Sequence, residues 1–126
     1  MTLILDAGAL IALERGHVDV VRAIEHERRE ERSAITHGGV VGQVWRGGTG
    51  RQSVLARVLS GVEILPLDDE LGRRAGRLLA LTRTSDVIDA ALVLLANHSD
   101  WILTSDPDDL QLLADAAGLH VDVIAV

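Results

Sequence analysis

The chain has 126 residues, no Cys and a formal net charge of -7. A chain of this length forms one domain and buries about two-thirds of the surface that it exposes when unfolded, so its core requires neither a disulfide nor a structural metal. The absence of Cys excludes disulfides, thiolate metal sites and Cys nucleophiles. The acidic balance argues against binding nucleic acid through a broad basic surface.

All 12 basic residues are Arg, and Lys is absent. A P-loop requires a Lys in its glycine-rich turn, so this class is excluded. The N-terminal sequence MTLILDAG has no basic segment and only a short apolar run. We therefore expect neither a signal peptide nor a membrane anchor, and a cytoplasmic location.

Short apolar runs alternate with helical patterns along the chain. We predict strands at residues 3–5, 33–36, 62–67, 101–104 and 121–126, and helices at 9–14, 17–31, 39–45, 52–59, 71–81, 86–97 and 107–117. This alternation predicts a single α/β domain over residues 1–126, with a mostly parallel five-stranded sheet covered on both faces. The C-terminal ends of parallel strands share one edge, where such folds bind ligands.

A glycine-rich segment, RGGTGR, covers residues 46–51. It lacks the preceding strand and the spacing of a dinucleotide fingerprint. We interpret it as a helix C-cap and loop, with contact to an RNA backbone through Arg46 or Arg51 as the alternative.

The predicted helix 86–97 is apolar on nearly every side, which is typical of a helix enclosed by protein. Asp86 and Asp89 are its exceptions and, being three residues apart, share one face. A carboxylate in such surroundings must be hydrogen-bonded, paired, protonated or bound to a metal.

Two further acids, Asp6 and Asp106, follow the first and fourth predicted strands. They meet at the ligand-binding edge if those strands are neighbours. Each of Asp6, Asp86 and Asp106 could be a helix N-cap, because Asp is favoured there. Capping does not explain Asp89, which lies beyond the capping position.

Clustered carboxylates without a Lys to neutralise them persist by binding a hard cation or by taking up protons. Mg²⁺ or Mn²⁺ suits such a cluster and suits phosphate-ester hydrolysis. Zinc is disfavoured because the five His residues, at positions 17, 26, 37, 98 and 120, form no paired ligand spacing. We interpret each His as a surface or local capping residue.

Three features together resemble a family: the apolar strand ending in Asp6, the helix SDVIDAALVLLA, and the strand ILTSD ending at Asp106 with PDDL after it. They look like a PIN domain of the VapC-type toxins of bacterial toxin–antitoxin pairs, over essentially the whole chain. The resemblance implies a three-layer α/β/α domain and a metal-dependent endoribonuclease. It also implies a homodimer and silencing by a cognate antitoxin. Asp6, Asp86 and Asp106 match the family's acidic positions.

One position departs from the family pattern, because Gln43 stands where a Glu is usual. Gln supplies no charge and is a poorer ligand for Mg²⁺. Asp89 could offset that loss if its side chain points into the cluster. Otherwise Gln43 is an ordinary helix residue and the site is weaker.

We therefore expect an Mg²⁺- or Mn²⁺-dependent ribonuclease in which a metal-activated water attacks a phosphodiester. Asp6, Asp86 and Asp106 would hold the metal, with Asp89 and Gln43 in support. Further roles are expected for Thr104 or Ser105, in orienting Asp106 or a phosphate, and for Arg46 and Arg51, in contacting RNA. Two alternatives remain: an inactive PIN-fold interaction module, and a phospho-receiver, which would normally need the missing Lys.

Overall fold

A computed structural model describes residues 1–47 and 50–126, apart from the side chain of Arg51. The strands are β1 (Leu3–Leu5), β2 (Ala34–His37), β3 (Val62–Leu65), β4 (Trp101–Thr104) and β5 (Asp122–Ala125). The helices are α1 (Ala7–Glu14), α2 (Val18–Arg29), α3 (Gly38–Val44), α4 (Arg51–Leu59), α5 (Asp69–Thr82), α6 (Val87–Leu94) and α7 (Pro107–Ala116).

The five strands form one sheet in the order β3-β2-β1-β4-β5, and every neighbouring pair is parallel. β1 is central and pairs with β4 in the register Leu3–Trp101, Ile4–Ile102 and Leu5–Leu103. The predicted α/β class and five-stranded sheet are confirmed, and the sheet is wholly parallel. Since β1 and β4 are neighbours, the residues that follow them lie at the same edge.

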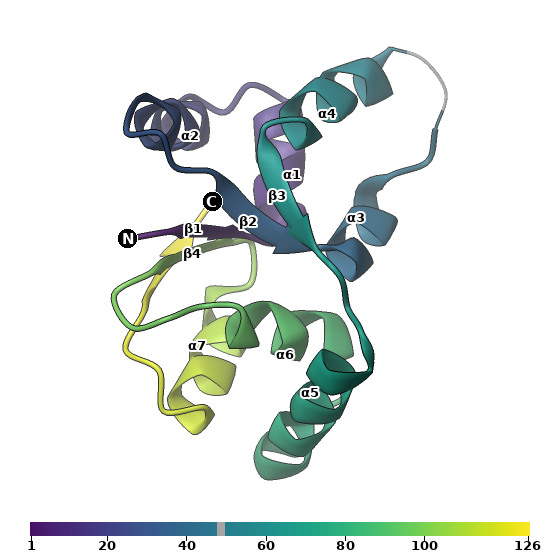
Figure 1. Cartoon of the computed structure of the whole chain (residues 1–126), viewed down its shortest axis with the longest axis vertical. Coiled ribbons are helices and arrows are strands. Elements are labelled where there is room, and N and C mark those ends of the chain that lie inside the picture. The colour runs from purple at the N-terminus through teal and green to yellow at the C-terminus, as the bar shows by residue number, and fades with distance from the viewer. Residues whose placement is uncertain (48–49) are drawn as a thin grey trace.

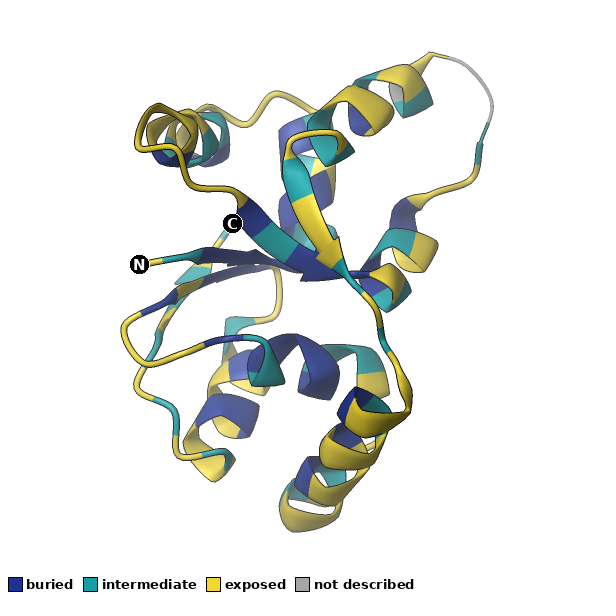
Figure 2. Cartoon of the chain, viewed as in Figure 1, coloured by how far each residue is buried: buried dark blue, intermediate teal, exposed yellow. Residues whose placement is uncertain are grey.

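Helices cover both faces of the sheet, as the predicted three-layer arrangement requires. Figure 1 shows α1, α2 and α4 on one face, and α5, α6 and α7 on the other. β1 is buried along its whole length, and α6 buries Ala90, Ala91, Leu92 and Val93. Figure 2 shows this burial concentrated where the helices meet the sheet. No helix in the described residues is long and apolar enough to cross a membrane.

The predicted elements differ from the observed ones mainly at their ends. β4 has the predicted bounds, whereas α6 ends at Leu94 rather than at Asn97. Leu95 and Ala96 continue the apolar composition, but their N–H groups bond to carbonyls three residues back. The helix therefore ends in a tighter turn of the 3₁₀ type.

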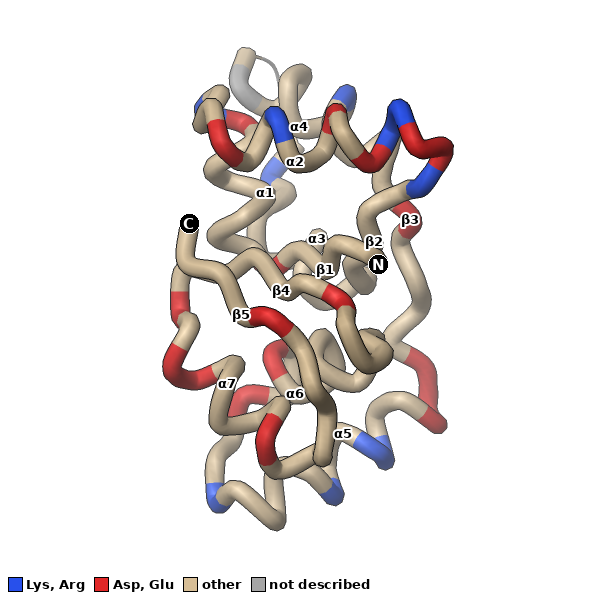
Figure 3. The backbone as a smooth tube through the Cα atoms, turned by 90° about the vertical axis from the view of Figure 1, so that its left-hand side faces the viewer, with Lys and Arg blue, Asp and Glu red and all other residues tan. Residues whose placement is uncertain are grey.

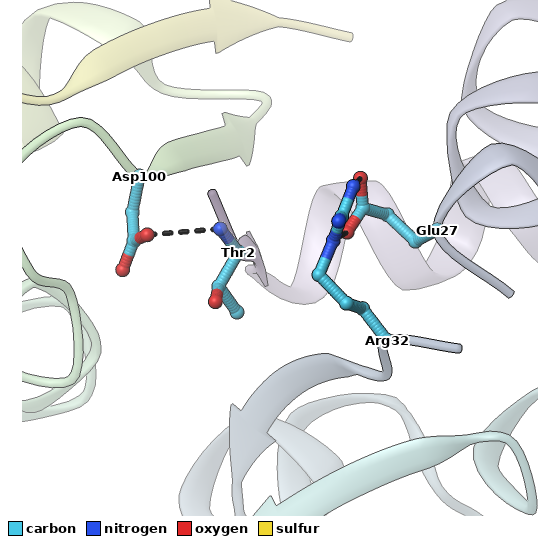
Figure 4. A network of polar contacts seen from close by, with 4 residues as sticks. All are labelled: Thr2, Glu27, Arg32 and Asp100. Atoms are coloured by element: carbon cyan, nitrogen blue, oxygen red, sulfur yellow. Dashed lines mark hydrogen bonds and ion pairs between the residues drawn. The ribbon is translucent and has the colours of Figure 1, made fainter. Parts of the chain in front are cut away.

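Acids at the N-terminal edge of the sheet are well partnered. Glu27, 1% exposed, forms a two-point ion pair with Arg32, at 2.7 Å to Nε and 3.2 Å to an Nη atom. Asp100, 6% exposed, accepts the backbone N–H groups of Thr2 and Asn97 at 2.9 and 2.8 Å. Figure 4 shows the ion pair and the bond between Thr2 and Asp100. These acids hold the starts of the strands in place.

Candidate functional site

Asp6 ties the central strand to its neighbour at the C-terminal edge. One carboxylate oxygen accepts the N–H of Ala9 at 2.8 Å, and the other accepts the Thr104 hydroxyl at 2.5 Å and the Ser105 N–H at 3.2 Å. Asp6 is 5% exposed, and burial raises its pKa, helped by repulsion from Asp106, while the three hydrogen bonds lower it. Asp6 is therefore both the N-cap of α1 and a meeting point of two strands.

Thr104 joins Asp6 to Asp106. Its buried hydroxyl donates to Asp6 and accepts the backbone N–H of Asp106 at 2.8 Å. The side chain of Asp106 is exposed and makes no capping hydrogen bond to α7. Thr104 therefore orients the backbone of Asp106, and the carboxylate of Asp106 is not used as a helix cap.

The loop after β4 packs tightly on the start of α1. A Cβ atom built on Gly8 would overlap the side chain of Ser105. Only glycine at position 8 permits this close approach. Ser105 itself is exposed at the edge, and its backbone N–H is what contacts Asp6.

Helix α6 brings Asp86 and Asp89 to the same region. Asp86 is the N-cap, and its carboxylate accepts the N–H of Asp89 at 3.0 Å. Asp86 is exposed, whereas Asp89 is partly buried. Capping accounts for Asp86 as well as for Asp6, but not for Asp89.

Asp89 experiences repulsion from the other acids of the edge. Burial is the main cause that raises its pKa to about 7, and the charges of Asp86, Asp6, Asp106 and Asp109 contribute to the same rise, in that order. A carboxyl group with this pKa carries a proton about half of the time at neutral pH. Asp89 therefore faces the other carboxylates, which identifies them as one electrostatic cluster.

Asp109 was not predicted as a site residue. It lies on α7, three residues after Asp106, and lines a cleft of about 330 Å³ beside Asp86 and Asp89. The cleft is lined by Thr84, Ser85, Asp86, Asp89, Asp109, Leu112 and Leu113. The three-residue spacing from Asp106 was available in the sequence, but an acid in the first turn of a helix is also expected from the helix dipole.

The C-terminal third of the chain supplies no side-chain cation to this cluster. Residues 84–126 contain no Arg or Lys and eight Asp residues: Asp86, Asp89, Asp100, Asp106, Asp108, Asp109, Asp115 and Asp122. In Figure 3, α6 and α7 carry acidic positions and no basic ones. Burial is the main cause of the raised pKa of Asp89, and the uncompensated charges of its acidic neighbours add to it.

The other predicted site residues lie on or near α3. Gln43 is exposed on this helix. The Arg46 guanidinium donates to the carbonyls of Gly42 and Trp45 at 3.1 and 2.8 Å, so it caps the C-terminus of α3. Arg51 begins α4, but its side chain lies outside the described part of the chain. The C-cap residue of α3 is Trp45, next to Arg46, and residues 48–49 of the predicted glycine-rich loop lie outside the described part of the chain.

The cluster has the donor chemistry of a site for a hard cation, because carboxylate oxygens are the ligands that Mg²⁺ and Mn²⁺ prefer. Within residues 1–47 and 50–126, however, no three His, Asp or Glu side chains converge closely enough to form a ready-made metal site. The exposed carboxylates of Asp86 and Asp106 would have to rotate toward a cation. The residues fit such an ion in charge and donor type.

His37 was interpreted as a surface or capping residue, and it is a fully buried cap. It ends β2 and its ring also contacts the carbonyl oxygen of Ile88 in α6. A single His after a strand carries no sequence signal of that contact, because its partner is 51 residues away.

Comparison of the chain with protein-family models and with curated proteins finds no match. The resemblance to PIN domains therefore rests on the residues of this chain, and its α/β/α fold is consistent with that resemblance.

Proposed function

We propose that the protein is an Mg²⁺- or Mn²⁺-dependent endoribonuclease of the PIN class. The single observation that carries the proposal is Asp89. It is half-buried, and burial together with the charges of four other carboxylates raises its pKa at the edge of the sheet where α/β folds bind ligands. A fold that gathers uncompensated charge there incurs a cost in stability, which a bound cation would offset.

The residues would have different roles in binding the cation, according to their surroundings. Asp6 is held rigidly by three hydrogen bonds, so it would provide a fixed oxygen ligand. Asp86 and Asp106 are exposed and would close on the ion, and Asp89 would complete the set after losing its proton. Thr104 would keep Asp6 and Asp106 at a constant separation.

A bound divalent cation lowers the pKa of water and neutralises charge that develops on phosphate oxygens. In the hydrolysis, a water oxygen bonds to phosphorus, the bond from phosphorus to one ribose oxygen breaks, and that oxygen takes up a proton. Asp89 would act as a ligand once the cation has displaced its proton, so the leaving ribose oxygen would take its proton from solvent water.

The biological setting that we propose is a type II toxin–antitoxin pair in the cytoplasm. The toxin would act on RNA as a homodimer and would be silenced by a cognate antitoxin. An Arg of the antitoxin that enters the cluster would supply the cation that residues 84–126 lack.

The proposal is tested by assaying cleavage of a single-stranded RNA with Mn²⁺ or Mg²⁺, with EDTA, and in the variants Asp6→Asn and Asp106→Asn. We expect cleavage in both variants to fall to the level measured with EDTA. Asp122→Asn, an exposed change on β5, is the matched control and should cleave normally. Full activity in both site variants would disprove the assignment.

A proton count gives a second test, independent of any RNA. Because a cation displaces the proton on Asp89, we expect about half a proton released per Mn²⁺ bound at pH 7, and almost none at pH 9. Calorimetry in buffers with different ionisation enthalpies measures this number. Release that does not change with pH would contradict a role for Asp89.

The alternative is an interaction module with the PIN fold and no useful metal binding. Gln43 favours it, as does the lack of a ready-made group of three ligands among the described residues. Titration with millimolar Mg²⁺ and Mn²⁺ separates the two functions. Neither heat nor a shift of the thermal midpoint would favour the module.

A further inference from the structure

The contact between His37 and α6 crosses the sheet edge. His37 ends β2 and caps α3, which carries Gln43, and the Ile88 carbonyl lies in the first turn of α6, between Asp86 and Asp89. The imidazole is 0% exposed. One side chain thus connects α3, which carries Gln43, to α6, whose first turn carries Asp86 and Asp89.

The hydrogen-bond partners of the ring determine its tautomer. A backbone N–H can only donate, so Nδ1 of His37 accepts the N–H of Gly39 at 3.0 Å. Nε2 must then carry the proton and donate it to the Ile88 carbonyl oxygen at 2.9 Å. Burial lowers the pKa of His37, which is consistent with a neutral ring that uses both nitrogens.

Packing supports the same connection independently. A Cβ atom built on Gly39 would lie 2.5 Å from Cδ1 of Ile88 and 2.9 Å from the His37 ring. The first turns of α3 and α6 therefore meet across these three residues. A side chain at position 39 would require the side chains of Ile88 and His37 to shift.

We propose that His37 is a positioning residue, whose Nε2 bond to Ile88 sets the first turn of α6, and with it Asp86 and Asp89, against α3. The consequence for cation binding rests on the proposed function. The consequence for the first turn of α6 does not, because it concerns only the geometry of the protein.

Two substitutions separate the ring's two hydrogen bonds. In His37→Asn, the side-chain oxygen can replace Nδ1 and keep the cap on Gly39, but the side chain is too short to reach Ile88. In His37→Gln, the amide nitrogen can replace Nε2 and keep the bond to Ile88. Both remove the imidazole from the same buried position, so a merely structural role predicts similar behaviour for the two.

We expect the amides of Ala90 and Ala91, in the first turn of α6, to exchange hydrogen about fivefold to tenfold faster in His37→Asn than in His37→Gln, as the loss of one hydrogen bond implies. Mn²⁺ should bind correspondingly more weakly to His37→Asn. His26→Asn, an exposed change on α2, is the control and should match the wild type. Equal exchange in the two His37 variants would overturn the proposal.

Two measurements cover the case in which His37→Asn does not fold. Nitrogen NMR of the wild type should show the Nε2–H tautomer, and the Nδ1–H tautomer would overturn the proposal. Gly39→Ala keeps the imidazole but places a Cβ atom against the His37 ring and Cδ1 of Ile88, so it strains the same contact and should speed exchange at Ala90 and Ala91. If the wild type binds no Mn²⁺, the proposed function fails, while the exchange and NMR results still decide the role of His37.

Discussion

The two edges of the sheet treat buried acids in opposite ways. At the N-terminal edge, Glu27 is paired with Arg32 and Asp100 accepts two backbone N–H groups. At the C-terminal edge, Asp89 faces four other carboxylates, and its pKa rises to about 7. Acids at the first edge therefore stabilise the fold, whereas the cluster at the second reduces stability.

This difference distinguishes the two sets of acids better than burial does. Glu27 and Asp6 are both buried, yet Arg32 lowers the pKa of Glu27, whereas burial and the neighbouring Asp106 raise the pKa of Asp6. Strain of this kind is maintained at sites where a ligand relieves it. If the two edges differ in this way, losing the partner of an acid at the N-terminal edge should lower the free energy of unfolding. Removing an acid at the C-terminal edge should raise it.

The largest effect should come from breaking the ion pair at the N-terminal edge. Arg32→Met leaves the carboxylate of Glu27, 2% exposed, without its cation. We expect the free energy of unfolding at pH 7 to fall, because a carboxylate shielded from water loses its cation, although the 40% exposure of the Arg32 side chain moderates the loss. Urea unfolding measures the change.

The pH dependence of the same variant checks the cause. Hydrogen bonding from Arg32 holds the pKa of Glu27 below its usual 4.5. The stability from the pair is therefore present above pH 4.5 and is lost as pH falls through the lower, folded-state pKa. Arg32→Met should lack this loss of stability at low pH, and the double variant Glu27→Met, Arg32→Met should recover most of the stability. A loss of stability at low pH in Arg32→Met as large as in the wild type would contradict this account.

At the C-terminal edge, removing an acid should stabilise the protein. The pKa of Asp89 is raised from 3.8 to about 7, so wild-type stability should fall as pH rises from about 4 to 8. At pH 8 this rise in pKa corresponds to at most about 4 kcal/mol in the free energy of unfolding. We expect Asp89→Asn to gain about 2 kcal/mol, because water in the cleft screens the charges. Thermal unfolding at several pH values from 4 to 8 measures both the stability gained by the variant and the pH dependence of the wild-type stability.

Asp122→Asn serves as the control for that experiment, since it removes an exposed acid from the edge strand β5. Its effect should be small and independent of pH between 5 and 8. A destabilised Asp89→Asn at pH 8 would remove the contrast between the two edges.

A smaller loss of stability is expected from Asp100→Asn. The amide keeps one oxygen for Thr2 or Asn97 but places an N–H₂ group against the other backbone N–H. We expect a loss of about 1 kcal/mol in the free energy of unfolding. Added Mn²⁺ should stabilise this variant as much as the wild type. A variant as stable as the wild type would show that this edge tolerates an unpartnered donor.

Most of the fold could be predicted from the sequence, because apolar runs such as Trp101–Thr104 end sharply at polar residues. The sequence placed Asp6 and Asp106 at one edge and let them meet only if their strands were neighbours, a condition that the strand order fulfils. His37 could not be interpreted in this way, since its role depends on a carbonyl 51 residues away. Asp109 carried no distinct signal, because an acid in the first turn of a helix is also what the helix dipole favours.

The smallest effect on stability, and the sharpest on function, is expected from Gln43→Glu. Gln43 is exposed, so a new carboxylate there should lower the unfolding free energy by at most about 0.5 kcal/mol without metal. If Gln43 reaches the cation, the added charge should tighten Mn²⁺ binding by about threefold to tenfold, as for one further oxygen ligand. Gln52→Glu, which keeps the oxygen that accepts from Arg46, adds the same charge on α4 as a control. Tighter binding in Gln43→Glu alone would extend the cluster to α3, whereas unchanged binding would limit it to Asp6 and the acids of α6 and α7.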